Sequence, residues 1–197
     1  MHQDELTQRL AERIVHHHKK MPFHDDGSKK RQKRCLVALA GGPGSGKSTI
    51  AEAVADKVSQ QHVKCQAISI EGFMKPKSAL SEEQLKKRGA IDTFDGEAVV
   101  NMFRTLRARG PGHELRVPVF DEEKSDPVPE GQLIEADTEA VIFEGIYMLA
   151  DREPWRRIEE LVDEKWFIHV RPELCRERVT ERRTSKGITK TKEEALR

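Results

Sequence analysis

The residues best suited to chemistry lie in a glycine-rich stretch with one lysine, from Gly41 to Thr49. It reads GGPGSGKST and fits the pattern G-x-x-x-x-G-K-[ST]. An apolar run at 35–40 precedes it, and apolar residues at helical spacing follow it at 50–58. A strand, a glycine loop and a helix start in this order make a nest of backbone N–H groups at the positive end of a helix dipole, which suits polyphosphate. The stretch therefore predicts a Walker A loop.

Within this loop, each residue type has an expected contribution to phosphate binding. Lys47 is expected near the β- and γ-phosphates, and Ser48 offers its hydroxyl to Mg²⁺. The glycines let the backbone turn toward the phosphates. The residues expected to bind the nucleotide are Gly41, Gly42, Pro43, Gly44, Ser45, Gly46, Lys47, Ser48 and Thr49.

Two acids follow apolar runs that are predicted to be parallel strands. Glu71 comes directly after the run at 65–70, and Glu144 lies in the continuous apolar run that begins at Ala140. Ligands of open parallel sheets bind beyond the carboxyl ends of the strands, so both acids should face the phosphate loop. Glu144 is predicted to hold Mg²⁺, because a buried acid without such a role would be costly. Glu71 is a candidate base, with a helix cap or an ion-pair partner as the alternative.

Two arginines are candidates for contacting a transferring phosphoryl group. Arg178 and Arg182 are four residues apart on a helix predicted to begin at Pro172, so they share one face and can grip a phosphate together. The same segment also contains glutamates. An ordinary charged helix therefore stays open as the alternative.

Three polar residues are candidates for binding a substrate hydroxyl. Asp95 precedes a helical pattern, where it can cap the helix and can also accept a hydrogen bond from an alcohol. Asp121 and Lys124 lie in a polar loop after an extended piece at 115–120, and such loops commonly carry substrate contacts. The alternative for these two is an exposed hairpin with solvated charges.

Strands and helices must alternate to position these candidates, and the chain has the pattern for it. Apolar runs at 35–40, 65–70, 140–147 and 165–170 are separated by helical patterns, which predicts an α/β domain with a parallel sheet. The 197 residues suffice for one such domain. Residues 1–34 are expected to form an N-terminal helix and a basic linker, and residues 35–197 the phosphate-binding domain.

Composition narrows the class of protein and of partner. Charged residues make up 35% of the chain and the net charge is +1, so no overall field favours nucleic acid. The sequence has no run of 18 apolar residues, so no membrane span is predicted. Its N-terminus lacks the apolar segment of a signal peptide, so secretion is not predicted either. We expect a cytoplasmic protein without nucleic-acid or membrane partners. The three scattered cysteines are expected to be packing residues in a reducing compartment.

Two clusters that look chemical have plainer interpretations. The triplet at 16–18, His16 to His18, ends a helical pattern, and its members point in different directions, which predicts a solvated helix end rather than a metal site. A basic cluster comprises Lys29, Lys30, Arg31, Lys33 and Arg34. It is expected to be a solvated linker, with a nuclear address or a nucleic-acid patch as the alternative.

Several ordered blocks of the sequence resemble the P-loop kinase family that includes uridine kinase, pantothenate kinase and phosphoribulokinase, and most closely its nucleoside- or fructoside-kinase-like branch. The resemblance covers residues 35 to 197. The blocks that carry it are GGPGSGKST at 41–49, ISIEGF at 68–73, RGAIDTFD at 88–95, VPVFDEEKSDPV at 117–128, VIFEGIYML at 141–149, EPWRRIEELVDEKWFIHV at 153–170 and RERVTERR at 176–183.

This resemblance implies a three-layer P-loop NTPase fold with a mostly parallel sheet and a lid at about 176–192. It implies ATP as phosphoryl donor, Mg²⁺, and a small hydroxyl-bearing acceptor such as a nucleoside, a sugar or a pantothenate-like molecule. Matched by position, Lys47, Glu71, Arg178 and Arg182 are the catalytic residues and Ser48 and Glu144 the metal-side ones. Phe73, Asp95, Asp121 and Lys124 fall in blocks that face the acceptor.

The sequence departs from the family pattern at two places. Glu71 stands where the family usually has an aspartate, and the extra methylene shifts the carboxylate. The chain ends at Arg197, where family members continue into a further helix and a last strand, so a missing C-terminal strand is expected, and a neighbouring copy of the chain is one way to cover that edge. An NTPase switch and a non-catalytic nucleotide-binding protein are the alternative functions, with a nucleoside-monophosphate kinase as a milder one.

Overall fold

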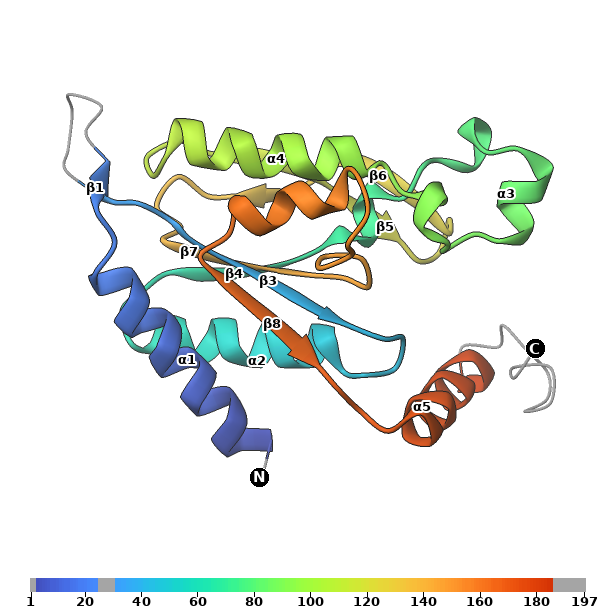
Figure 1. Ribbon diagram of the computed structural model, residues 1–197, viewed down its shortest axis with the longest axis horizontal. Coiled ribbons are helices and arrows are strands. Elements are labelled where there is room, and N and C mark those ends of the chain that lie inside the picture. The colour runs from blue at the N-terminus through green and yellow to red at the C-terminus, as the bar shows by residue number, and fades with distance from the viewer. Residues whose placement is uncertain (1–2, 25–30, 186–197) are drawn as a thin grey trace.

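Four parallel strands form the central sheet in the computed structural model, which describes residues 3–24 and 31–185 (Figure 1). Each neighbouring pair in this sheet is parallel. The strands lie side by side in the order Cys65–Ser69 (β4), Ala140–Glu144 (β7), Cys35–Gly41 (β3) and Glu164–Ile168 (β8). The predicted α/β fold with a parallel sheet is therefore confirmed.

Helices cover both faces of this sheet and give the fold its three layers (Figure 1). Helices α1 (Gln3–Lys19) and α2 (Lys47–Gln60) pack on one face, and α4 (Gly96–Arg109) with the 3₁₀ helix η4 (Trp155–Glu160) packs on the other. Successive strand residues point to opposite faces, so β3 contributes to both cores. Helix α5 (Pro172–Ser185) lies beyond the carboxyl ends of the strands. None of the described helices is both long and apolar enough to cross a membrane.

An antiparallel hairpin stands next to the end of β4. Its strands are β5 (Leu115–Asp121) and β6 (Asp126–Ile134), and it packs on the 3₁₀ helix η1 (Ile70–Phe73) that follows β4. Gly72 permits this approach, because a Cβ there would lie 2.2 Å from the Pro118 carbonyl oxygen. The remaining short elements are Phe23–His24 (β1), Arg31–Gln32 (β2), Lys77–Ala79 (η2), Glu82–Lys86 (α3) and Ile91–Thr93 (η3).

Arg34 is buried, so the expectation of a solvated basic linker was wrong for this residue. Only 2% of its surface is exposed, and its guanidinium donates hydrogen bonds to backbone carbonyls. The acceptors are Thr138, Gly110, His113, Glu135 and Ala136, at 2.6 to 3.3 Å. Burial lowers the pKa of Arg34. This arginine joins the start of β3 to the segments that follow α4 and β6. Lys29 and Lys30 lie outside the described residues.

The C-terminal end of α1 also differs from its expected solvation. His16 is exposed and His17 half-buried, but His18 is buried, with its Nε2 4.0 Å from Glu139 Oε1. Burial lowers the pKa of His18. The three rings do point in different directions, as helical geometry requires. The helix packs through Ala11 and Ile14 into the core that it shares with α2.

Candidate functional site

The predicted phosphate loop connects β3 to α2 in the arrangement that the sequence indicates. Gly44 and Gly46 have φ of 74° and 86°, in the left-handed region that favours glycine. Gly46 is the N-cap of α2, and no side chain of the described residues caps that helix. The backbone N–H groups of its first turn are thus available to an anion, and the helix dipole favours negative charge there.

Lys47 is the first residue of α2, and its ammonium folds back over the loop. Its Nζ donates a 3.0 Å hydrogen bond to the Gly42 carbonyl oxygen. Burial lowers the pKa of Lys47, whereas the neighbouring Glu144 and Glu71 carboxylates oppose that shift. The lysine therefore lies between the loop and the two acids.

Ser48 and Glu144 lie in direct contact at the sheet end of the loop. Ser48 Oγ donates a 3.0 Å hydrogen bond to Glu144 Oε1, and only 5% of the glutamate is exposed. A hydroxyl and a carboxylate are hard oxygen ligands of the kind that Mg²⁺ prefers. Among the described residues no cluster of three His, Cys, Asp or Glu side chains could hold a metal. Mg²⁺ sites commonly combine one or two protein carboxylates with substrate phosphates and water.

Glu71 lies beside Glu144 because parallel strands end at the same edge. Ser69 of β4 pairs with Glu144 of β7, and Glu71 follows two residues later in η1. Glu71 is open to solvent, yet the protein atoms around its carboxylate desolvate it. This desolvation, followed by repulsion from Glu144, raises the pKa of Glu71, against the opposing effect of Arg182 and Lys47.

The two arginines of α5 reach the same place from the other side. Arg178 Nη1 lies 3.4 Å from the Gly44 carbonyl oxygen, and Arg182 is close enough to act electrostatically on both Lys47 and Glu71. A cavity of about 320 Å³ brings together the six residues predicted to act on phosphate, metal or the acceptor proton: Lys47, Ser48, Glu71, Glu144, Arg178 and Arg182.

The residues predicted to face the acceptor are not part of that cavity wall. Asp95 caps α4, since its side chain accepts the Ala98 N–H at 2.9 Å. Asp121 accepts the N–H groups of Glu123 and Lys124 and pairs with the Lys124 ammonium at 3.2 Å, and these bonds lower the pKa of Asp121. Phe73 is buried in the core below α4. Asp95 is thus a helix cap, Asp121 and Lys124 belong to a hairpin turn and Phe73 is a core side chain, and the contacts of these residues with an acceptor stay predictions.

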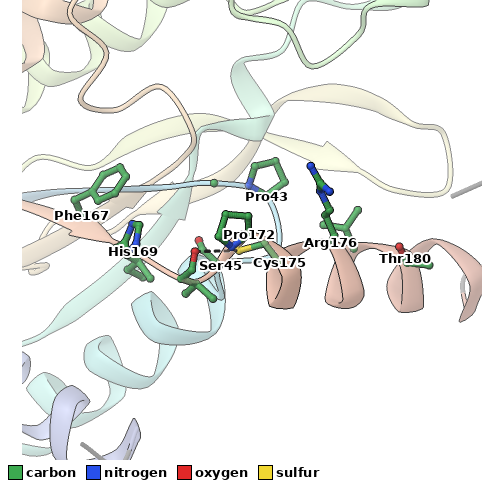
Figure 2. A pocket seen from close by; sticks show the side chains of 12 residues that line it. Pro43, Ser45, Phe167, His169, Pro172, Cys175, Arg176 and Thr180 are labelled. Carbon is green, nitrogen blue, oxygen red and sulfur yellow. Dashed lines mark hydrogen bonds between the residues drawn. The ribbon is translucent and has the colours of Figure 1, made fainter. Parts of the chain in front are cut away.

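A second, larger cavity of about 810 Å³ lies between the loop, the end of β8 and the first turns of α5 (Figure 2). Its wall includes Pro43, Ser45, Phe167, His169 and Cys175. Phe167 is 66% exposed. Pro43 and Ser45 of this wall belong to the predicted loop, but neither Phe167 nor Cys175 was singled out as a site residue from the sequence. The usable signal was the position of Phe167 near the carboxyl end of a predicted parallel strand, at the edge of the sheet where the loop lies.

A parallel sheet with a Walker A loop, a buried acid at the next strand end and an arginine-bearing helix across the loop defines a P-loop nucleotide-binding protein of the kinase type. The sequence model of the Phosphoribulokinase / Uridine kinase family matches residues 36–190 of the chain. The chain therefore belongs to that family, as its sequence blocks predicted.

Relatives in sequence and structure agree with this membership. A Schizosaccharomyces pombe protein provisionally named a uridine kinase is 35% identical over 176 residues, 85% of this chain and 74% of that one. A Silicibacter structure, provisionally described as a fructose transport system kinase, is 25% identical with a TM-score of 0.81, over 100% of this chain and 87% of that one. D-glycerate 3-kinase from Cryptococcus neoformans shares the fold, with a TM-score of 0.66 and 12% identity over 98% of this chain and 83% of that one.

Proposed function

We propose that this protein is an ATP-dependent kinase that transfers the γ-phosphoryl group to a hydroxyl of a small metabolite, such as a nucleoside, a sugar or a pantothenate-like molecule. The observation that supports it best is the meeting of Lys47, Glu71, Glu144 and the two α5 arginines in one cavity beside the loop. Phosphoryl transfer to an alcohol requires cations that neutralise the phosphates, one acid that holds the metal, and a second acid that acts on the acceptor hydroxyl.

In this proposal the positive groups act on the phosphates. The N–H groups at the start of α2 bind the phosphate chain, and Lys47 exchanges its bond to the Gly42 carbonyl for one to a phosphate oxygen. Arg178 and Arg182 approach from α5 and neutralise negative charge on the phosphoryl group during its transfer.

Ser48 and Glu144 fit a divalent cation, because they offer a hydroxyl and a buried carboxylate oxygen already 3.0 Å apart. Mg²⁺ held there would neutralise charge on the β- and γ-phosphates. Glu144 then has a role that explains an acid at the end of an otherwise apolar strand.

Glu71 is proposed to orient the acceptor hydroxyl and accept its proton. Its raised pKa makes it a better proton acceptor than an ordinary glutamate, while it stays ionised above that pKa. Glu71 belongs to the cavity wall and is exposed, so a small molecule can approach it from the solvent side.

The direct test is ADP release with Mg²⁺ and ATP in the presence of single acceptors. The panel holds uridine and other nucleosides, fructose and other sugars, and pantothenate, chosen partly because relatives carry those names. One acceptor should raise turnover well above ATP alone, and Lys47→Ala should abolish the rise. Equal turnover with every acceptor would instead favour an NTPase switch. Tight ATP binding with turnover insensitive to Glu71→Gln would favour a non-catalytic nucleotide-binding protein.

A cytoplasmic location is part of this proposal. Cys35, Cys65 and Cys175 are all free thiols in the structure, which fits a reducing compartment.

A further inference from the structure

Tyr147 lies in the turn that follows the buried acid of β7. It comes three residues after Glu144 and directly after Ile146, which belongs to the wall of the 320 Å³ cavity. Its phenol donates a 2.7 Å hydrogen bond to the carbonyl oxygen of Gly89, 58 residues away in the sequence. Gly89 belongs to residues 88–95, called the acceptor segment below. The bond therefore joins the turn after the metal-side acid to this segment.

The acceptor segment is also attached to the chain that carries Glu71. The Asp95 N–H donates to the Phe73 carbonyl oxygen, and the Lys75 N–H donates to the Thr93 carbonyl oxygen, both at 2.8 Å. A shift of the acceptor segment is thus transmitted to the residues that follow Glu71. Tyr147 lies where the two sides of the proposed site are connected.

The two acids are held next to each other by a contact that does not involve Tyr147. Gly145 packs directly on Ile70, since a Cβ at Gly145 would lie 2.0 Å from Ile70 Cγ1. Backbone packing thereby fixes the turn after Glu144 against the end of β4. Loss of the Tyr147 bond should accordingly free the acceptor segment and leave the acids and the phosphate loop in place.

The ring and the hydroxyl of Tyr147 have separate contacts. The ring packs against Phe94 and Trp155, with centroids 5.4 Å and 5.8 Å away. The Gly89 carbonyl is the hydrogen-bond partner of the hydroxyl, and no other is found among the described residues. A phenylalanine would keep the ring contacts and lose only the bond. Tyr147→Phe therefore isolates the hydroxyl.

Gly89 gives a second way to disturb the same bond. Its φ of 103° is a conformation that side chains rarely adopt, and a Cβ there would meet nothing within 4 Å. Gly89→Ala should therefore change the backbone that presents the carbonyl without creating a clash.

We propose that the Tyr147 hydroxyl is a positioning group for phosphoryl transfer: its bond to Gly89 holds the acceptor segment beside Glu71 and so determines how well the acceptor hydroxyl is placed. Tyr147 acts through the Gly89 carbonyl and not on the reacting atoms. This inference rests on the proposed function, because it assumes that an acceptor binds beside Glu71.

Amide hydrogen exchange, followed by mass spectrometry on the folded protein, tests the attachment without any substrate. In Tyr147→Phe, exchange in peptides from residues 88–95 should be faster by about three- to tenfold, the effect of losing one ordinary hydrogen bond. Exchange at 41–49 should not change. Thr105→Val is the matched control, because it removes a hydroxyl that donates to the Asn101 carbonyl within α4 at 2.8 Å. Unchanged exchange at 88–95 in Tyr147→Phe would overturn the proposal.

Steady-state kinetics tests the consequence for the reaction. Uridine, fructose and pantothenate are each varied at saturating ATP and Mg²⁺, and ATP is then varied with the acceptor that supports turnover. Tyr147→Phe should lower kcat/KM for that acceptor by about tenfold, since small displacements near a reacting group are costly. The KM for ATP should stay within about twofold of wild type, because the phosphate loop does not move. Thr105→Val should match wild type in both measurements.

The double variant of Tyr147→Phe and Gly89→Ala shows whether both changes act through one bond. It should lose no more than the worse single variant, whereas losses that multiply would show independent effects and contradict the proposal. Acceptor kinetics like those of wild type in Tyr147→Phe, or a loss shared equally by ATP and the acceptor, would also overturn it.

A wild-type protein that phosphorylates none of the acceptors would refute the proposed function, and with it the kinetic half of this inference. Hydrogen exchange would still decide whether Tyr147 holds the acceptor segment. The two failures are therefore distinguishable.

Discussion

The hydroxyl of Ser48 donates a hydrogen bond of 3.0 Å to Oε1 of Glu144, 96 residues further along the chain. This bond joins the first turn of α2 to the last residue of β7. It exists because β3 and β7 are parallel neighbours in register, with Leu39 opposite Glu144, so the loop after one strand faces the end of the other. A protein hydroxyl and a buried carboxylate are thereby held together at the phosphate site.

Glu144→Gln and Ser48→Ala should both weaken the dependence of turnover on Mg²⁺. The glutamine removes the charge that a divalent cation needs, and the alanine removes the hydroxyl ligand. We expect a loss in turnover of about 100-fold or more for Glu144→Gln and a smaller one for Ser48→Ala, measured by titrating Mg²⁺ at fixed ATP. Glu52→Gln, an exposed carboxylate on α2, is the control. A Glu144→Gln protein with an unchanged Mg²⁺ titration would contradict the metal role.

Glu71 should set the acid limb of the pH profile. The ionised form accepts the acceptor proton, so kcat/KM should fall as the pH drops through the pKa of Glu71. Because that pKa is raised, the limb should lie above the value of about 4.3 for an ordinary glutamate. Glu71→Gln should remove the limb and lower kcat by about 10²–10⁴-fold.

Glu144→Gln gives an independent check on Glu71. It removes a neighbouring negative charge that raises the pKa of Glu71, so any residual activity should have its acid limb at lower pH. A shift to higher pH would mean that the limb belongs to another group.

The parallel arrangement of the strands explains why the side of the candidate site that lies at the phosphate loop was predictable. An acid at the end of an apolar run must face the loop if the runs are parallel strands, and Glu71 and Glu144 do so. Arg178 and Arg182 were found from their spacing on one helix. Short-range sequence patterns sufficed for these residues, because a parallel sheet brings the carboxyl ends of its strands together independently of the conformation of the loops.

The positions of Arg34 and Cys175 could not be predicted in this way. Arg34 bonds to carbonyls 76 to 104 residues away, and every residue type offers a backbone carbonyl, so no sequence pattern marks the acceptors. Cys175 has its position from the packing of α5 on Gly44. For Asp95 the sequence left open a helix cap alone or a cap that also meets a substrate hydroxyl, and for Asp121 a solvated hairpin or a substrate contact. The observed hydrogen bonds are those of a cap and a turn, and the substrate contacts stay predictions.

Arg34→Ala should destabilise the fold by about 3 kcal/mol or more. It leaves buried carbonyl oxygens without their donor, and each such group costs roughly 1–3 kcal/mol. Arg34→Lys should rescue little, since one ammonium cannot reproduce the planar fork of donors. Urea unfolding measures both, and exposed Lys33→Ala should stay within about 0.5 kcal/mol of wild type. Equal stabilities of the two Arg34 variants and wild type would refute the role.

His18 should make the protein less stable in mild acid. Burial lowers its pKa in the folded state, so the unfolded chain takes up a proton at higher pH. The contribution of the neutral ring is complete above the unfolded pKa of about 6.5 and is lost as the pH falls from there toward the lowered folded value. Urea unfolding at several pH values should show a smaller loss for His18→Gln than for wild type. The exposed His16→Gln should behave as wild type.

Arg88 should control how well the acceptor is used without affecting ATP. Its guanidinium pairs with Asp126 at 2.6 Å, donates to the Ser125 carbonyl, and lies over the Phe120 ring, so it fastens the turn of the β5–β6 hairpin. That hairpin packs on Gly72, next to Glu71.

Loosening the hairpin should therefore disturb the proposed acceptor side of the site. We expect Arg88→Ala to lower kcat/KM for the acceptor by about 10–100-fold, since small displacements near a reacting group are costly, while the KM for ATP stays nearly constant. Lys87→Ala, which breaks only an exposed pair with Glu83, is the control. Steady-state kinetics with each substrate varied in turn decides the matter. A loss that falls equally on ATP and the acceptor would mean that Arg88 stabilises the whole domain rather than the acceptor side.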